Sequence, residues 1–137
     1  VPADLVEGTL RAGFDRLADL DTAWEPAVYT MFLVSEVHPL ADGNGRVARV
    51  MMNAELVAGR QARIIVPTVL RDDYLGGLRR LTRDDDPSIL IKVLRFAHDY
   101  TALVDFSDLA SAADQMRRTN AFDDPDSPSR LRLPPAD

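Results

Sequence analysis

Residues 38 to 49 read His38-Pro39-Leu40-Ala41-Asp42-Gly43-Asn44-Gly45-Arg46-Val47-Ala48-Arg49. Proline disfavours the helical conformation for the residue before it, so a helix that precedes this stretch is expected to end at about residue 37. The Gly-Asn-Gly segment is typical of a tight turn and leads into a second periodic segment. The stretch therefore predicts a helix, a short loop and another helix.

Apolar residues on both sides of the loop recur at helical spacing. The segment from about residue 23 to 37 is apolar around most of its circumference, which predicts a central helix. Thr22 and Glu25 form a capping box at its start. Residues 46 to 58 predict the next helix, with Gly59 as its stop and with Val47, Val50, Met51, Ala54, Leu56 and Val57 mostly inward.

The rest of the chain also favours helices. Helical patterns cover residues 3–20, 71–83, about 86–105 and 107–118, whereas Ile64-Ile65-Val66-Pro67 is interpreted as a connection. We expect an all-α fold, with one domain over residues 1–119. Asp and Pro replace large apolar residues after Asn120, so residues 120–137 are expected to form a loosely ordered tail.

Composition excludes several classes of protein. The 137 residues carry a formal net charge of −6, which argues against nucleic-acid binding because such domains usually present a basic face. The chain has no cysteine for disulfides or thiolate metal sites. Neither a run of about 18 apolar residues nor a signal peptide is visible, so a cytoplasmic protein without a membrane span is expected.

The loop has the chemistry of a polyphosphate site. Two glycines around an asparagine, directly before a helix, let successive backbone N–H groups and the positive helix end face one anion. Arg46 and Arg49 lie three residues apart on one helix face, where two guanidiniums can hold a di- or triphosphate by bidentate hydrogen bonds.

Two further side chains add reactive groups. Asp42 offers the hard carboxylate oxygen that Mg²⁺ prefers beside substrate phosphates. Histidine is the side chain most often used as a general base, so His38 can remove a proton from a hydroxyl nucleophile. Taken singly, each residue has a plainer interpretation: a turn, a helix cap, a solvated arginine pair and a histidine at a helix end. Their conjunction within twelve residues favours the functional interpretation.

The stretch resembles the signature of the Fic family (filamentation induced by cyclic AMP), His-Pro-Phe-x-Asp/Glu-Gly-Asn-Gly-Arg-x-x-Arg. It matches at every specified position except Leu40, where the family has a buried Phe that anchors the loop. The resemblance extends over roughly residues 20 to 105. It implies a Fic-like helical bundle with the motif loop between two central helices, and transfer of AMP from ATP to a Ser, Thr or Tyr hydroxyl of a target protein.

The resemblance also implies a role for each motif residue. His38 would be the catalytic base, and Asp42 would ligate Mg²⁺ on the α- and β-phosphates. Gly43, Asn44 and Gly45 would hold the α-phosphate, while Arg46 and Arg49 would face the β- and γ-phosphates. Pyrophosphate would leave. Tyr74 stands at a position that borders the adenine in the family, or is a half-buried aromatic.

Two other family features are not evident in the sequence. The residues before His38 predict helices rather than a β-hairpin flap. No glutamate fits the inhibitory Ser/Thr-x-x-x-Glu-Gly/Asn pattern, since Glu7-Gly8 follows Ala3. We expect any restraint to come from another chain or segment. Alternatives to a protein adenylyltransferase are a non-catalytic nucleotide-binding or interaction module, transfer of another phosphate-containing group, and a purely structural helical domain.

Overall fold

The computed structural model describes residues 1–135, whose regular secondary structure is entirely helical, with no strand among these residues. The prediction of an all-α fold is therefore confirmed. Residues 136–137, the end of the predicted tail, lie outside the described residues. None of the helices in the described part is both long and apolar enough to cross a membrane.

The chain forms two compact units, Val1–Gln61 and Ala62–Asp137, which we call the N-terminal and the C-terminal unit. This division differs from the single domain over residues 1–119 that the sequence suggests. The boundary falls in the connection after Gly59, which lacks the run of Gly, Ser and Pro by which linkers are usually recognised.

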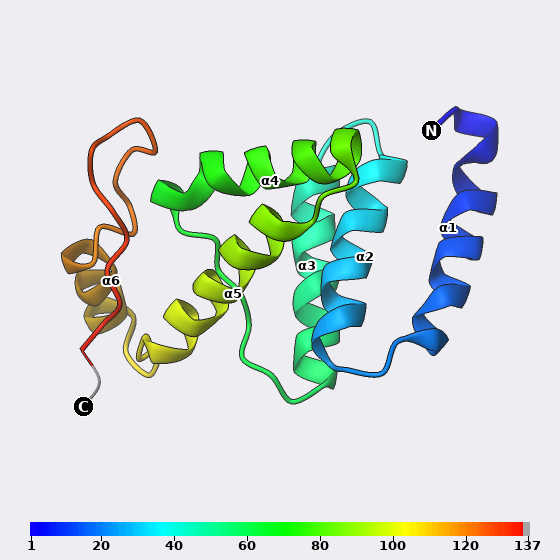
Figure 1. Cartoon of the computed structure of the whole chain (residues 1–137). Coiled ribbons are helices and arrows are strands. Elements are labelled where there is room, and N and C mark those ends of the chain that lie inside the picture. Colours follow the sequence, from blue (N-terminus) through cyan, green and yellow to red (C-terminus); the bar gives the residue numbers. More distant parts are fainter. Residues whose placement is uncertain (136–137) are drawn as a thin grey trace. The chain divides into compact units, whose positions relative to one another are not determined.

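The N-terminal unit consists of η1 (Ala3–Leu5), α1 (Val6–Asp15), η2 (Arg16–Asp19), α2 (Trp24–Val37) and α3 (Asn44–Ala58). Figure 1 shows α2 and α3 side by side and antiparallel, joined by the motif loop. Their facing residues are almost fully buried: Ala27, Met31, Val34, Val37, Ala48, Met52 and Leu56. This core fixes the two helix ends between which the loop is held.

The start of α2 follows the capping prediction with one change of partner. Thr22 Oγ1 accepts a hydrogen bond from the Glu25 backbone N–H at 3.1 Å. The Glu25 carboxylate accepts in return from the Asp21 N–H at 3.3 Å rather than from Thr22. The capping box therefore forms at the turn that leads into α2, as the spacing of Thr22 and Glu25 predicts.

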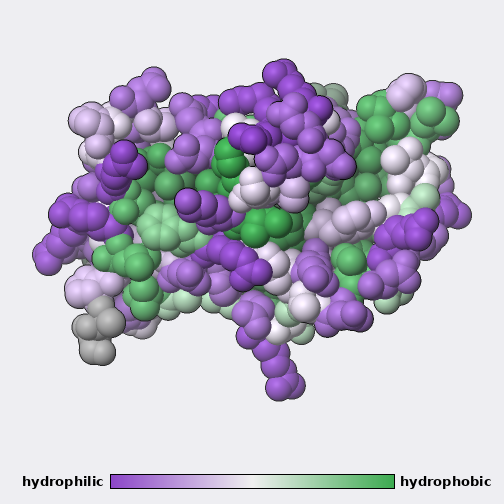
Figure 2. Space-filling view, in the orientation of Figure 1, coloured by the Kyte–Doolittle hydropathy of each residue, from purple (hydrophilic) through white to green (hydrophobic). Residues whose placement is uncertain are grey.

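Helix α1 is less deeply packed than α2 and α3. Gly13 is its only buried residue among those described, and a Cβ there would meet the Leu33 side chain at 2.5 Å, so Leu33 of α2 packs directly on this glycine. On the face displayed in Figure 2, hydrophobic residues gather over the N-terminal end of α1, where Val1 and Leu5 are about half exposed. Most of the unit's stability must therefore come from the α2–α3 pair.

The C-terminal unit consists of η3 (Thr68–Leu70), α4 (Arg71–Asp84), α5 (Ser88–Leu103) and α6 (Leu109–Arg118). Helices α4 and α5 pack closely at Gly77, where a Cβ would lie 2.9 Å from the Leu90 backbone. Gly76 and Gly77 weaken the helical pattern of residues 71–83. The close approach of α5 explains the glycine at position 77.

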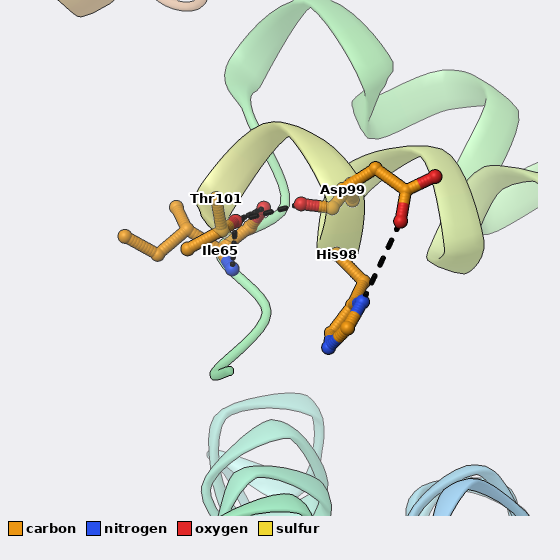
Figure 3. Close-up of polar contacts among 5 residues, drawn as sticks. Ile65, His98, Asp99 and Thr101 are labelled. Carbon is orange, nitrogen blue, oxygen red and sulfur yellow. Dashed lines mark hydrogen bonds and ion pairs between the residues drawn. The ribbon is translucent and has the colours of Figure 1, made fainter. Parts of the chain in front are cut away.

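The connection before η3 is anchored rather than paired in a sheet, as predicted. Thr101 Oγ1 accepts a hydrogen bond from the Ile65 N–H at 3.0 Å and donates to the Ala97 carbonyl oxygen at 2.7 Å (Figure 3). On the same helix His98 Nδ1 lies 3.7 Å from Asp99 Oδ1. The Thr101 hydroxyl therefore links the connection to α5. Because its partners are backbone groups, no sequence pattern predicts this link.

The segment after α6 has no regular helix, yet it is packed. Ala121 and Leu131 are buried in a cluster with Val69, Tyr100, Val104, Ala112 and Met116. The Arg132 N–H donates to the Thr119 carbonyl oxygen at 3.0 Å, so the chain folds back along the end of α6 (Figure 1). The interpretation of residues 120–137 as a loose tail overlooks these contacts, because two small apolar anchors carry little weight in a composition rich in Asp and Pro.

Candidate active site

His38 terminates α2. It adopts a left-handed backbone conformation, with φ 55° and ψ 58°, and its N–H donates to the Val34 carbonyl oxygen at 3.1 Å. The side chain is exposed, and Nδ1 lies 3.4 Å from the Ser35 carbonyl oxygen. If Nδ1 carries the proton that faces this oxygen, Nε2 presents the lone pair of a base.

The turn after the loop begins α3 in a way that needs glycine. Gly43 has φ 84°, a conformation that costs an ordinary residue about 1–2 kcal/mol, and it is the N-cap of α3. Its carbonyl oxygen accepts from the N–H groups of Arg46 and Val47 at 3.0 Å each. No side chain caps this helix end, and the N-terminus of a helix is a general site for anions.

The Asn44 side chain fixes the loop by two hydrogen bonds to its backbone. Its side chain is 2% exposed, accepts from the Leu40 N–H at 2.8 Å and donates to the Leu40 carbonyl oxygen at 2.7 Å. The amide thereby satisfies both backbone groups of one loop residue. Both polar atoms of the Asn44 side chain therefore bond the loop. Its backbone N–H is the group that can contact a ligand.

The anchor expected at position 40 is not observed. Leu40 is 45% exposed, so its side chain does not fix the loop to the core as the family's Phe is expected to do. The family's buried Phe therefore has no counterpart in this chain, and the Asn44 amide holds residue 40 through its backbone instead.

The loop's two opposite charges are paired. Arg46 Nη2 lies 3.2 Å from Asp42 Oδ2, and both side chains are largely exposed. An exposed pair of this kind contributes at most about 1 kcal/mol, so it opens readily when a stronger partner binds. Asp42 can therefore supply one hard oxygen to a cation that phosphates also coordinate. No cluster of three or more His, Asp or Glu side chains suited to a metal occurs in residues 1–135.

Both guanidiniums lie against the glycine turn. A Cβ on Gly43 would meet Arg46 Nη2 at 3.3 Å, and a Cβ on Gly45 would meet Arg49 Nη1 at 3.5 Å. Arg46 is exposed, whereas Arg49 is half-buried. The glycines thus leave room for two cationic groups directly beside the backbone N–H groups of the turn.

These residues share one hollow of about 310 Å³, which we call the motif hollow. It is lined by His38, Ala41, Asp42, Gly43, Asn44, Gly45, Arg46 and Arg49. Every residue that the sequence analysis singled out as a base, metal ligand or phosphate contact therefore faces the same space. The sequence analysis did not anticipate Ala41, whose small side chain carries no chemical signal.

Several other expectations concern residues outside this hollow. Val47, Val50 and Val57 of α3 were expected to face inward but are 36%, 68% and 48% exposed. The prediction is confirmed for Leu56 but wrong for these valines and for the exposed Ala54, because the buried face of α3 runs through Ala48, Met52 and Leu56. Tyr74 is buried, at 3% exposure, within the C-terminal unit.

Glu7 does not take the position of an inhibitory glutamate. Its carboxylate pairs with Arg11 one turn further along α1, at 2.8 Å, and both side chains are exposed. This pair accounts for the one glutamate that approached the inhibitory pattern. The expectation that restraint comes from another chain or segment stays a prediction.

Comparison with known proteins supports the motif. The model of the Fic/DOC family matches residues 2–56, which include α1, α2, the motif loop and most of α3. Residues 2–56 are therefore similar to the Fic/DOC family, as the motif predicts. This match begins earlier and ends sooner than the resemblance over residues 20 to 105. Searches of curated proteins and of solved structures found no match.

Proposed function

We propose that the motif hollow is the active site of a protein adenylyltransferase, which moves AMP from ATP to a Ser, Thr or Tyr hydroxyl of a target protein. The observation that carries the proposal is the convergence of a base, a carboxylate, an uncapped helix start and two guanidiniums on one hollow. The family match over the same residues adds support. An intracellular source of ATP makes a cytoplasmic location part of the proposal.

The transfer is a single displacement at phosphorus. The target hydroxyl oxygen bonds to the α-phosphorus of ATP, and the bond from that phosphorus to the bridging oxygen of the β-phosphate breaks. The proton of the hydroxyl passes to His38, and pyrophosphate leaves. The long contact from His38 Nδ1 to the Ser35 carbonyl oxygen supports Nε2 as the accepting atom.

We assign the phosphates to three kinds of group, as the family resemblance implies. The N–H groups of Gly43, Asn44 and Gly45 face the α-phosphate at the start of α3, where the helix end is positive. Arg46 balances charge near the β-phosphate and Arg49 near the γ-phosphate. Because the Asn44 side chain already fixes the turn and both guanidiniums lie against it, the loop backbone needs little reorganisation on binding, and Arg46 has only to change its partner.

Asp42 is proposed to hold Mg²⁺ together with the α- and β-phosphates. The ion would neutralise phosphate charge, which weakens the electrostatic barrier to an incoming nucleophile. In this arrangement Arg46 exchanges its contact with Asp42 for a phosphate oxygen. The exposure of the Asp42–Arg46 pair supports that exchange, since little burial has to be undone.

A second candidate function is nucleotide binding without transfer. The observation that favours it is the exposed Leu40, which leaves the loop held by Asn44 without an apolar anchor. A loop that positions phosphates but shifts relative to His38 would bind ATP and catalyse nothing. Binding and transfer must therefore be measured on the same preparation.

Incubation of a cell lysate with the protein, Mg²⁺ and ATP labelled at the α-phosphate is expected to label a protein. His38→Ala should lower the labelling by about 100-fold or more, the range for loss of a positioned base. Arg49→Ala should weaken labelling at low ATP, whereas Arg117→Ala, the same change on α6 outside the hollow, should not.

Three outcomes separate the candidates. Label transferred only from the γ-phosphate would mean a kinase-type transfer instead. ATP binding by calorimetry without labelling of any protein would favour the non-catalytic module. Labelling that survives His38→Ala at full strength would exclude His38 as the base.

A further inference from the structure

The C-terminal unit contains a hollow of about 700 Å³, more than twice the volume of the motif hollow. One wall is a single face of α5, formed by Ile89, Lys92, Val93 and Phe96 at positions three and four residues apart. Ile89 and Lys92 are exposed, whereas Val93 and Phe96 are half-buried and Phe96 also packs against the core cluster. The face of α5 toward this space is therefore apolar apart from Lys92, the only lysine in the chain.

Two other walls enclose this space, which we call the α5 hollow. Val69, Leu70 and Asp73 contribute from η3 and the first turn of α4, and the returning segment contributes Pro125 and residues 127–131. The returning segment, which follows α6, is held in place by contacts with the rest of the unit. Leu131 is buried in the core cluster, and Asn120 Nδ2 donates to the Arg130 carbonyl oxygen at 2.9 Å. The hollow is therefore largely formed before any ligand arrives.

The lining of the α5 hollow has more basic than acidic side chains, although the protein as a whole is acidic. Lys92 and Arg130 are contributed by different walls, and Asp73 is the only carboxylate in the lining. None of the three forms an ion pair with another side chain of residues 1–135. Since the chain as a whole carries −6, an anion would be attracted here by these two local cations and not by the overall field.

We propose that the α5 hollow binds a small organic anion with an apolar body, such as an aryl sulfonate or an alkyl carboxylate. The volume lies in the range of about 300–1,000 Å³ typical of ligand sites, and the lining combines apolar side chains with a few charged ones. No lining residue is shared with the motif hollow. The site is thus independent of nucleotidyl transfer and goes beyond the proposed function.

The anilinonaphthalene sulfonate ANS and its uncharged analogue N-phenyl-1-naphthylamine are a suitable pair of fluorescent probes, titrated into the whole folded protein. Saturable binding of one ANS per chain is expected, and the uncharged analogue should bind more weakly. Lys92→Gln and Arg130→Gln should each raise the dissociation constant for ANS by about three-fold, as expected for a solvent-exposed charge pair. Both should leave binding of the uncharged analogue unchanged. Methanesulfonate, which has no apolar body, should not displace ANS.

Two control variants exclude other anion sites. Arg117→Gln removes a positive charge from an exposed position on α6, outside the hollow. Arg49→Gln removes a positive charge from the motif hollow. Neither should change the dissociation constant for ANS, and circular dichroism should show all variants equally helical. Equal binding of the two probes, an equal loss in Arg117→Gln, or no saturable binding would overturn the proposal. A loss only in Arg49→Gln would assign ANS to the motif hollow and overturn it equally.

Discussion

The motif hollow and the α5 hollow are built in opposite ways. All residues that line the first come from a single stretch of twelve, at the turn between α2 and α3. The second draws on three segments, which begin at residues 69, 89 and 125. A local site depends on the conformation of one loop, whereas an assembled site depends on how distant segments pack. The difference explains why the first is visible in the sequence and the second is not.

The largest expected effect concerns Asn44, on which the local site depends. Asn44→Ala removes both hydrogen bonds to Leu40 and leaves two backbone groups without this partner. We expect the free energy of unfolding to fall by about 1–3 kcal/mol, and AMP transfer by about 100-fold because the loop shifts. Urea unfolding and the labelling assay measure the two effects.

Leu40→Phe is the control for that experiment, because it restores the family residue at a position that is 45% exposed. Its unfolding free energy should stay within about 0.5 kcal/mol of the original chain. A larger change from Leu40→Phe than from Asn44→Ala would mean that residue 40, and not the buried amide, anchors the loop.

A comparable loss is expected at Gly77, on which the packing of the C-terminal unit depends. An added Cβ would lie 2.9 Å from the Leu90 backbone, so Gly77→Ala should destabilise the chain by about 1–3 kcal/mol. Gly76→Ala is the matched control, since its Cβ would meet nothing within 4 Å, and it should stabilise α4 by up to about 1 kcal/mol. Thermal unfolding of both variants tests the pair, and equal effects would contradict a close approach at Gly77.

A smaller effect is expected within the glycine turn. Gly43→Ala forces a side chain into a left-handed conformation and should cost about 1–2 kcal/mol. Gly45→Ala lies within α3, and its Cβ would make only an ordinary contact with Arg49, so no destabilisation is expected. Urea unfolding separates the two variants. If both glycines tolerate alanine equally, the turn does not have the conformation described.

The smallest effect is a dependence on alkaline pH at Tyr100. Burial raises the pKa of this phenol, although its 2.6 Å hydrogen bond with Thr119 opposes the shift. The folded state therefore prefers the neutral phenol. The resulting stability is fully present below about pH 10, the pKa in an unfolded chain, and is lost as pH rises through the higher pKa of the folded chain.

Tyr100→Phe removes this ionisation and tests the sign of the effect. The urea midpoint of the original chain should fall between pH 9 and 11 by more than that of the variant. A steeper fall in Tyr100→Phe would mean that the folded state favours the ionised phenol. Because Tyr100 and Thr119 link α5 to the end of α6, the variant also tests how firmly the returning segment is held.

The sequence predicted the helices and the motif better than it predicted which residues are buried. The spacing around residues 23–37 and 71–83 gave helices whose ends agree with the structure to within about one residue. It did not distinguish the buried face of α3, since valines and alanines alternate around that helix. It also did not predict that the Asn44 side chain holds Leu40 by two hydrogen bonds, because residue type alone does not say whether a side chain contacts a ligand or its own loop.

The sequence by itself determined an all-α chain and a loop motif similar to that of the Fic/DOC family, since both depend on neighbours a few residues apart. Tertiary structure alone decided the division into two units, the packing of Ala121 and Leu131, and the α5 hollow. The physical reason is the range of the interactions. Helix periodicity and turn chemistry act within one or two turns, whereas burial depends on which distant segments meet.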